Sequence, residues 1–100
     1  MAVSQDYSAT ITWTQDWAAH LAVNNASPFT ISSATAVPTQ PTGATVTVAS
    51  TTVTDAGSSV TFRVSQTGLT TPTLVNVVVT ASMSNGDTDQ RNFAIQFTDT

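Results

Sequence analysis

The residues with catalytic potential are few in this sequence of 100 residues. His20 is the single histidine, and no G-x-S-x-G elbow marks one serine as a nucleophile. A solvated or hydrogen-bonded histidine explains His20 better than a catalytic one, because no base and orienting group accompany it in the sequence. The sequence therefore predicts a protein that is not an enzyme.

Clustered oxygen ligands near the end of the chain are a second chemical possibility. Asn85, Asp87 and Asp89 could supply the amide and carboxylate oxygens that calcium prefers. The spacing of an EF-hand or of a calcium-binding repeat is missing, and Asn, Gly and Asp are also the usual turn-forming residues. We therefore expect a turn at this point, with no metal ion and no cofactor.

Two tryptophans and one arginine could serve recognition. Trp13 and Trp17 could stack on sugar rings, although tryptophan more often belongs to a core or its rim. Arg91 could pair with Asp87 or Asp89 at the rim of the domain, or it could contact another subunit. The rim pairing is the simpler interpretation of Arg91.

The best-defined element that could position these side chains is the stretch 73–98. Apolar residues alternate with polar residues along both of its arms, which predicts two strands with one buried face each. These apolar residues are Val75, Val77, Val79, Ala81 and Met83 in the first arm and Phe93, Ile95 and Phe97 in the second. The stretch therefore predicts a long β-hairpin.

The turn of this hairpin decides whether the two apolar sets lie on one face. A two-residue turn would put them on opposite faces, because directly opposed residues share a face of the sheet. A three-residue loop over 84–86, with a left-handed glycine at its last position, opposes Val77 to Phe93 and Val75 to Ile95. We predict the three-residue loop, with Phe62, Val79 and Phe97 in the same core.

The rest of the chain predicts more short strands between turn signals. We expect strands at 7–14, 29–37 and 44–49, a short strand through Val53 and a strand at 60–65, with loops at 38–43, 55–58 and 66–72. Residues 16–23 fit either a strand that buries Trp17 or one helical turn capped by Asp16. Seven to eight strands at this spacing predict an all-β, Ig-like antiparallel β-sandwich in a single domain over residues 1–100.

Composition excludes several classes of partner. The chain has a net charge of −4 and only 8% charged residues, too few cations to neutralise nucleic-acid phosphates or an anionic membrane surface. Its 21 threonines and 11 serines replace a charged surface with hydroxyls, and β-branched threonine suits an exposed pleated sheet. There is no cysteine, no basic and apolar leader, and no apolar run long enough to span a membrane.

Three stretches carry a resemblance to a known family. They read D-W-x-x-x-L over 16–21, I-S-S-A-T-A-V-P over 31–38 and V-N-V-V-V-T-A-S-M-S-N-G-D-T-D-Q-R-N-F-A-I-Q-F over 75–97. Together they resemble the small Ig-like, fibre-to-tail adaptor-like structural proteins of tailed bacteriophages, over residues 6–98. The most specific part is T-D-Q-R-N-F, where members typically carry T-D-E-R-S-F. The chain departs from the family in Gln90, in an extra N-terminal strand with Trp13, and in lacking a glycine pair after Val64.

The resemblance implies a non-enzymatic structural protein located in the virion, which joins tail or fibre parts or decorates the head. Its partners would be other virion structural proteins, as a homo-oligomer or in many copies on the particle, without nucleic acid or membrane. The resemblance carries over no catalytic or ligand-binding residue. A carbohydrate-binding or adhesion module is the alternative, which an exposed Trp13 or Trp17 on a concave face would favour, and a hydrolase is a distant third.

The mode of docking follows from the scarcity of charge. Without lysine, the sheet edges have few of the charged side chains that keep strands from pairing with other chains. The predicted first strand, 7–14, is the best candidate for main-chain contact with another subunit, with Tyr7, Ile11 and Trp13 as anchors. Arg91 is the fourth candidate for an inter-subunit contact.

Overall fold

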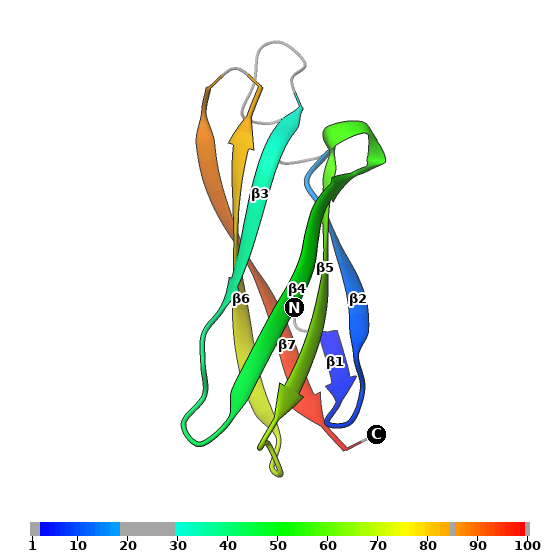
Figure 1. Cartoon of the computed structure of the whole chain (residues 1–100), viewed down its shortest axis with the longest axis vertical. Helices are drawn as coiled ribbons and strands as arrows, with labels where there is room; N and C mark the ends of the chain where they lie inside the picture. Colours follow the sequence, from blue (N-terminus) through cyan, green and yellow to red (C-terminus); the bar gives the residue numbers. More distant parts are fainter. Residues whose placement is uncertain (1–2, 19–29, 85, 100) are drawn as a thin grey trace.

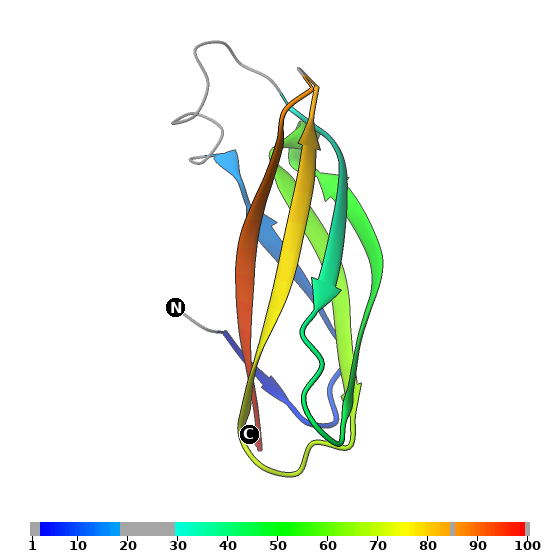
Figure 2. The same cartoon turned by 90° about the vertical axis from the view of Figure 1, so that its left-hand side faces the viewer.

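The structure is a computed structural model that describes residues 3–18, 30–84 and 86–99, and two β-sheets pack face to face in it (Figure 1). The described elements are β1 (Val3–Asp6), β2 (Ile11–Asp16), β3 (Ile31–Pro38), β4 (Thr45–Thr54), the 3-10 turn η1 (Asp55–Gly57), β5 (Ser59–Thr67), β6 (Thr73–Met83) and β7 (Thr88–Thr98). One sheet has the strand order β1-β7-β6-β3 and the other has the order β2-β5-β4. Figure 2 shows the two layers from the side.

The strand order is that of an immunoglobulin-like sandwich. In the seven-stranded form of that fold, the neighbours B-E-D lie in one sheet and C-F-G in the other. Here β2-β5-β4 and β3-β6-β7 occupy these positions, while β1 pairs with β7 in parallel. The predicted all-β, Ig-like sandwich is therefore confirmed, with seven strands among the described residues.

The C-terminal hairpin has the predicted register. Val75 lies opposite Ile95 and Val77 lies opposite Phe93. The Met83 N–H donates to the carbonyl of Asp87 at 2.7 Å, and the Gly86 N–H donates to the carbonyl of Met83 at 3.0 Å. Gly86 has the left-handed φ of 95° that the three-residue loop requires. Asn85, between them, lies outside the described residues.

The predicted first strand, 7–14, is correct over 11–14, which belong to β2, and wrong over 7–10, which begin with a turn. Tyr7 and Ser8 form this turn. The Asp6 carboxylate accepts the Ser8 N–H at 2.9 Å, and the Asp6 carbonyl accepts the Ala9 N–H at 3.1 Å. An aspartate that bonds the backbone two residues further on favours a turn over a strand. The chain therefore leaves β7 after β1 and joins the other sheet as β2.

Two strands contain a bulge, and one of these bulges changes a prediction. In β3 the register shifts between Ile31 and Ser33, so Ala34 and Ala36 face inward while Val37 is 59% exposed. In β4 the register shifts between Ala49 and Thr52, at the left-handed Ser50 (φ 56°), so the segment through Val53 is the end of β4 and not a separate strand. The expected turn at 55–58 is present as η1 and Ser58, and β5 extends to Thr67, so the following loop starts later than predicted.

The core lies between the sheets as predicted. Its buried apolar residues are Trp17, Ile31, Val46, Val60, Phe62, Val64, Val75, Val77, Val79, Ala81, Met83, Ile95 and Phe97. Phe93 is half-buried and packs edge-on against Phe62, with ring centroids 5.2 Å apart. Beyond Trp17, the Ala18 N–H donates to the Asp16 carboxylate at 2.8 Å. His20 and the choice between strand and helical turn over 16–23 otherwise lie outside the described residues.

Candidate functional site

The edges of the two sheets are the candidate contact sites, because edge strands present backbone groups to other chains. The edge strands are β1 and β3 in one sheet and β2 and β4 in the other. β1 has only four residues, β3 has a bulge and ends at Pro38, and β4 also has a bulge. Each of these features hinders pairing with another strand. β2 pairs with β5 over six residues without a bulge or a proline.

A glutamine side chain covers part of the edge of β4. The Gln40 Nε2 donates to the carbonyl of Val46 at 2.8 Å, and the Gln40 Oε1 accepts the Val46 N–H at 2.8 Å. The amide thus makes the two bonds that a neighbouring strand would make at this residue. The edge of β4 is therefore occupied at Val46.

The backbone of β2 alternates between β5 and the open side. The Trp17 N–H donates to the carbonyl of Ser58 at 2.8 Å, which continues the β2–β5 pairing beyond Asp16. Because hydrogen-bonded and non-hydrogen-bonded pairs alternate in an antiparallel ladder, the backbone groups of Thr12, Thr14 and Asp16 point away from β5. The Asp16 carbonyl accepts a bond from Arg91 Nη1 at 2.9 Å. Thr12 and Thr14 therefore form the centre of the edge of β2, which is open among the described residues and which we call the β2 edge (residues 12–16).

A buried glutamine fixes the lower half of β2. Gln5 on β1 is 1% exposed, and its Nε2 donates to the carbonyls of Val64 at 2.7 Å and Ala9 at 3.1 Å. Its Oε1 accepts the indole N–H of Trp13 at 2.8 Å. Since Gln5 belongs to one sheet and both Val64 and Trp13 to the other, one side chain connects the two sheets.

A second glutamine repeats this arrangement at the upper half of β2. Gln15 is 7% exposed, and its Nε2 donates to the carbonyl of Asn92 on β7 at 3.2 Å. Its Oε1 accepts the indole N–H of Trp17 at 3.0 Å. Two glutamine–tryptophan pairs thus hold β2 on its inner face. They keep the strand extended and regular, including the backbone groups that point away from β5.

Neither Gln5 nor Gln15 was predicted as a site residue from the sequence. Gln15 shares the inward parity of Ile11 and Trp13, so a polar residue at an inward position was the available signal. Gln5 gave no such signal, because the turn after β1 was not recognised and its partners lie far along the chain.

The four predicted contact residues do not converge on one patch. Trp13 points inward, with its ring 5.9 Å from that of Phe93. Arg91 lies over the ring of Trp17, with 5.4 Å from its guanidinium carbon to the ring centroid, in the range of a cation–π contact. Ile11 is half-buried at the start of β2. The prediction that these residues contact another subunit stays a prediction, and Trp13 and Arg91 have contacts within the chain.

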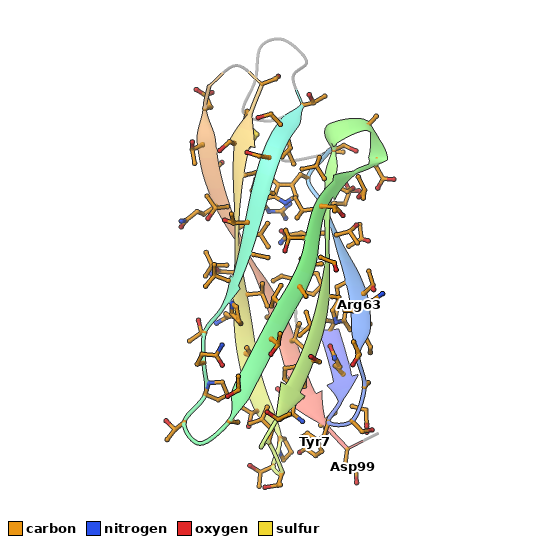
Figure 3. All side chains as sticks on the ribbon, viewed as in Figure 1. Tyr7, Arg63 and Asp99 are labelled. Carbon is orange, nitrogen blue, oxygen red and sulfur yellow. The ribbon has the colours of Figure 1, made fainter. Side chains whose placement is uncertain are left out.

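Tyr7 lies in the turn between β1 and β2, near Asp99 (Figure 3). It is half-buried and packs against the core cluster. Desolvation raises the pKa of the Tyr7 phenol, and the nearby carboxylates of Asp99 and Asp6 raise it further. Its backbone carbonyl accepts a bond from Gln66 Nε2 at 2.6 Å, so the turn at Tyr7 is also tied to the other sheet.

The outer faces of both sheets are rich in uncharged polar groups. The outward residues of the β1-β7-β6-β3 sheet include the two exposed large apolar residues, Val37 and Leu74, and Asp6 is the charged member of this described face. On the other sheet, the hydroxyl of Thr61 lies 3.0 Å from the hydroxyls of both Thr14 and Thr54. Each face therefore bears little charge.

The described residues offer no further chemical site. Within residues 3–18, 30–84 and 86–99, no three His, Asp or Glu side chains gather as a metal ion would need. The same part of the chain contains no helix long and apolar enough to cross a membrane. Trp17 is fully buried, and Trp13 is half-buried and packs against the core, with its ring centroid 5.9 Å from that of Phe93.

No family model, curated protein or solved structure matches this chain.

Proposed function

We propose that this chain is a non-enzymatic structural protein of a tailed-bacteriophage virion. It docks by strand edges onto other virion structural proteins, as a tail or fibre adaptor or as a head decoration. The resemblance over residues 6–98 supports the class of particle. The observation that carries the docking mode is the β2 edge, a regular six-residue edge strand that lacks the bulge, proline or covering glutamine found at β3 and β4.

Strand-edge docking matches the chemistry of the surface. An added strand gains main-chain hydrogen bonds, which need no charged side chains, and side chains on alternate positions supply specificity. The outer faces beside the β2 edge are hydroxyl-rich, so a strand added there extends an existing array of threonines. Repeated copies on a particle would multiply a weak edge contact into stable attachment.

The test of the proposed function is the composition of the particle. Phage particles that encode this chain are purified by density gradient, and an antibody against the recombinant chain is used for immunogold labelling and quantitative blotting. We expect several copies per particle, labelled at one morphological position. Absence of the chain from particles that are intact and infective would overturn the proposal.

A matched pair of variants tests the docking edge. In Thr14→Pro the missing N–H is one that points away from β5, so the fold should persist while incorporation into particles falls. In Trp13→Pro the missing N–H faces β5, so the fold itself should fail. Normal incorporation of a folded Thr14→Pro protein would show that another surface docks.

A further inference from the structure

The charges on the outer face of the β2-β5-β4 sheet are placed unequally. Arg63 on β5 lies opposite Thr12 of β2, is exposed, and donates from Nε to the Thr12 hydroxyl at 3.4 Å. Its side chain extends across β2 toward the β2 edge (Figure 3). Asp16, also exposed, ends the same strand on the same face. The two charges are separated along the sheet by four residue positions, about 13 Å, so they do not neutralise each other within one chain.

We propose that two copies of this chain pair antiparallel through the β2 edge, about a two-fold axis at Thr14. Thr14 then lies opposite Thr14 of the second copy, and Thr12 lies opposite Asp16 of the second copy. These are the residues whose backbone groups point away from β5, so each opposed pair exchanges two N–H···O bonds. The Asp16 carbonyl, which also accepts Arg91 Nη1, uses its second lone pair for this bond. The two β2-β5-β4 sheets become one continuous sheet that runs through both copies.

Charge complementarity selects this partner and this direction. Arg63 already leans over Thr12, and in the antiparallel pair the next residue across is Asp16 of the second copy. Their Cα atoms would be roughly 10 Å apart, two strand spacings, which an arginine and an aspartate side chain span. A two-fold axis makes this contact twice. A parallel pairing of the same two edges would instead turn the second copy over, which places its Asp16 on the opposite face of the sheet from Arg63.

The rest of β2 is compatible with such a pairing. The two glutamine–tryptophan pairs lie on the inner face and use no backbone group of Thr12 or Thr14. The cross-strand threonine contacts of Thr14 and Thr61 would continue into the second copy, and threonine pairs across strands are favourable. This inference deepens the proposed function and rests on it, since it names the partner of the same docking edge.

Cross-linking tests the register. The chain has no cysteine, so Thr14→Cys introduces a single thiol at the proposed axis. Opposed residues in a hydrogen-bonded antiparallel pair have Cα atoms about 5.5 Å apart, within disulfide range. We expect mild oxidation to give a covalent dimer of the folded protein. Thr47→Cys, which is exposed on β4 of the same sheet, is the matched control and should remain monomeric.

A charge swap tests the partner contact. Sedimentation of the purified protein over a range of concentrations gives the dimer dissociation constant. Arg63→Asp and Asp16→Arg should each raise that constant by about tenfold or more, because each places like charges across the axis. The double variant should return it to within about threefold of the parent, since the swapped pair has the same complementarity. Within one chain the two positions are too far apart to rescue each other.

Two results would overturn the inference. One is a parent protein that stays monomeric while Thr14→Cys cross-links no faster than Thr47→Cys. The other is a dimer that the double charge swap does not restore, although both single variants keep the melting temperature of the parent. A purified monomer that is nonetheless found in particles would refute this pairing and leave the proposed function standing. A β2-paired dimer that is absent from particles would refute the proposed function and leave the pairing standing.

Discussion

At the scale of residues, this domain places amide side chains where many proteins place charged ones. Gln5, Gln15, Gln40 and Gln66 each use both the nitrogen and the oxygen of the amide in bonds to other residues. An amide can donate and accept at once without the desolvation cost of burying an ion. In an acidic chain with two cations, glutamine is thus a suitable connector between sheets.

Gln5 should be the most sensitive of these positions. Gln5→Ala leaves the Trp13 indole N–H without its partner and removes the bond to the Val64 carbonyl, and a buried unsatisfied group costs about 1 to 3 kcal/mol. We therefore expect the free energy of unfolding to fall by roughly 2 to 4 kcal/mol, the combined effect of the lost bonds and packing. Urea denaturation measures this, and Gln90→Ala on the exposed outer face is the control. Equal midpoints for the two variants would contradict the role of Gln5.

Tyr7 gives the domain an alkaline pH dependence. Its pKa is raised in the folded state, by desolvation first and by the carboxylates of Asp99 and Asp6 next. A group whose folded pKa is raised contributes stability that is present below its unfolded pKa, about 10 for tyrosine, and is lost as the pH rises through the folded pKa. We expect stability to decline above that pH in the parent and to stay level there in Tyr7→Phe.

The sequence makes this measurement unusually free of interference. Tyr7 is the single tyrosine, and the chain has no cysteine and no lysine. Its two cationic residues are arginines, which stay charged in this pH range. The near-ultraviolet phenolate absorbance follows the same titration directly. A Tyr7→Phe protein that loses stability in parallel with the parent would assign the effect to another group.

At the scale of elements, the register of a strand could be predicted from the sequence where several large alternating side chains define one of its faces. The hairpin register followed from large alternating residues in both arms, because one loop length alone brings Val77 opposite Phe93. In β3 and β4 most alternating residues are small or hydroxylated, so a bulge could change the faces at little cost in buried area, and in β3 it leaves Val37 exposed. The turn at Tyr7 was hidden for a related reason, since alternation continues across it.

The candidate site was harder to predict than the fold. Edge exposure depends on which strands become neighbours, and the β2 edge is open because β1 joins β7 in the other sheet. The connecting roles of Gln5 and Gln15 depend on partners 59 and 77 residues away. Alternation along a single strand contains no information about such partners. Arg91 and Trp13 were predicted as contact residues, and their internal contacts depend on the same long-range arrangement.

Alanine should destabilise the protein more at Gly57, in the turn after β4, than at Gly86, in the hairpin loop. Gly57 and Gly86 have φ values of 90° and 95°, so alanine is strained at either position. A Cβ at Gly57 would also lie 2.5 Å from the Cβ of Thr30, whereas a Cβ at Gly86 meets nothing within 4 Å. We expect Gly86→Ala to cost about 1 kcal/mol and Gly57→Ala to cost clearly more. Thermal unfolding of the two variants checks the order.

Thr30 explains why a substitution at Gly57 should destabilise more than its own turn. Thr30 also bonds the hairpin loop, since its carbonyl accepts the Ser84 N–H at 2.8 Å and its own N–H donates to the Ser84 hydroxyl at 3.2 Å. Displacing Thr30 would therefore disturb both the η1 turn and the hairpin. Equal destabilisation by the two alanines would indicate that backbone strain alone matters at Gly57.

At the scale of the whole molecule, β1 joins the beginning of the chain to its end and one sheet to the other. It pairs in parallel with the last residues of β7, from Val3 opposite Ile95 to Asp6 opposite Thr98 (Figure 1). Gln5 reaches the other sheet at Val64. The N-terminal segment is therefore part of the sandwich of its own chain, and a protein without residues 1–12 should not remain well folded.

Removal and return of this strand provides the last prediction. A variant that lacks residues 1–9 loses the β1–β7 ladder, the buried Gln5 and the packing of Val3 and Tyr7 against the core. We expect a large fall in melting temperature, because several buried groups lose their partners together. A synthetic peptide of residues 1–9 should raise the melting temperature again in proportion to the logarithm of its concentration, since it binds the folded form.

The same peptide with Gln5→Ala is the matched control, because it can form the parallel ladder but cannot bond Val64 and Trp13. It should rescue the truncated protein much less well at equal concentration. Rescue by the parent peptide would also show that this strand can be supplied by a separate chain, which is the condition for exchange between subunits. A truncated protein that melts with the parent would contradict the structural role of β1, because the bonds of Gln5 would then be dispensable.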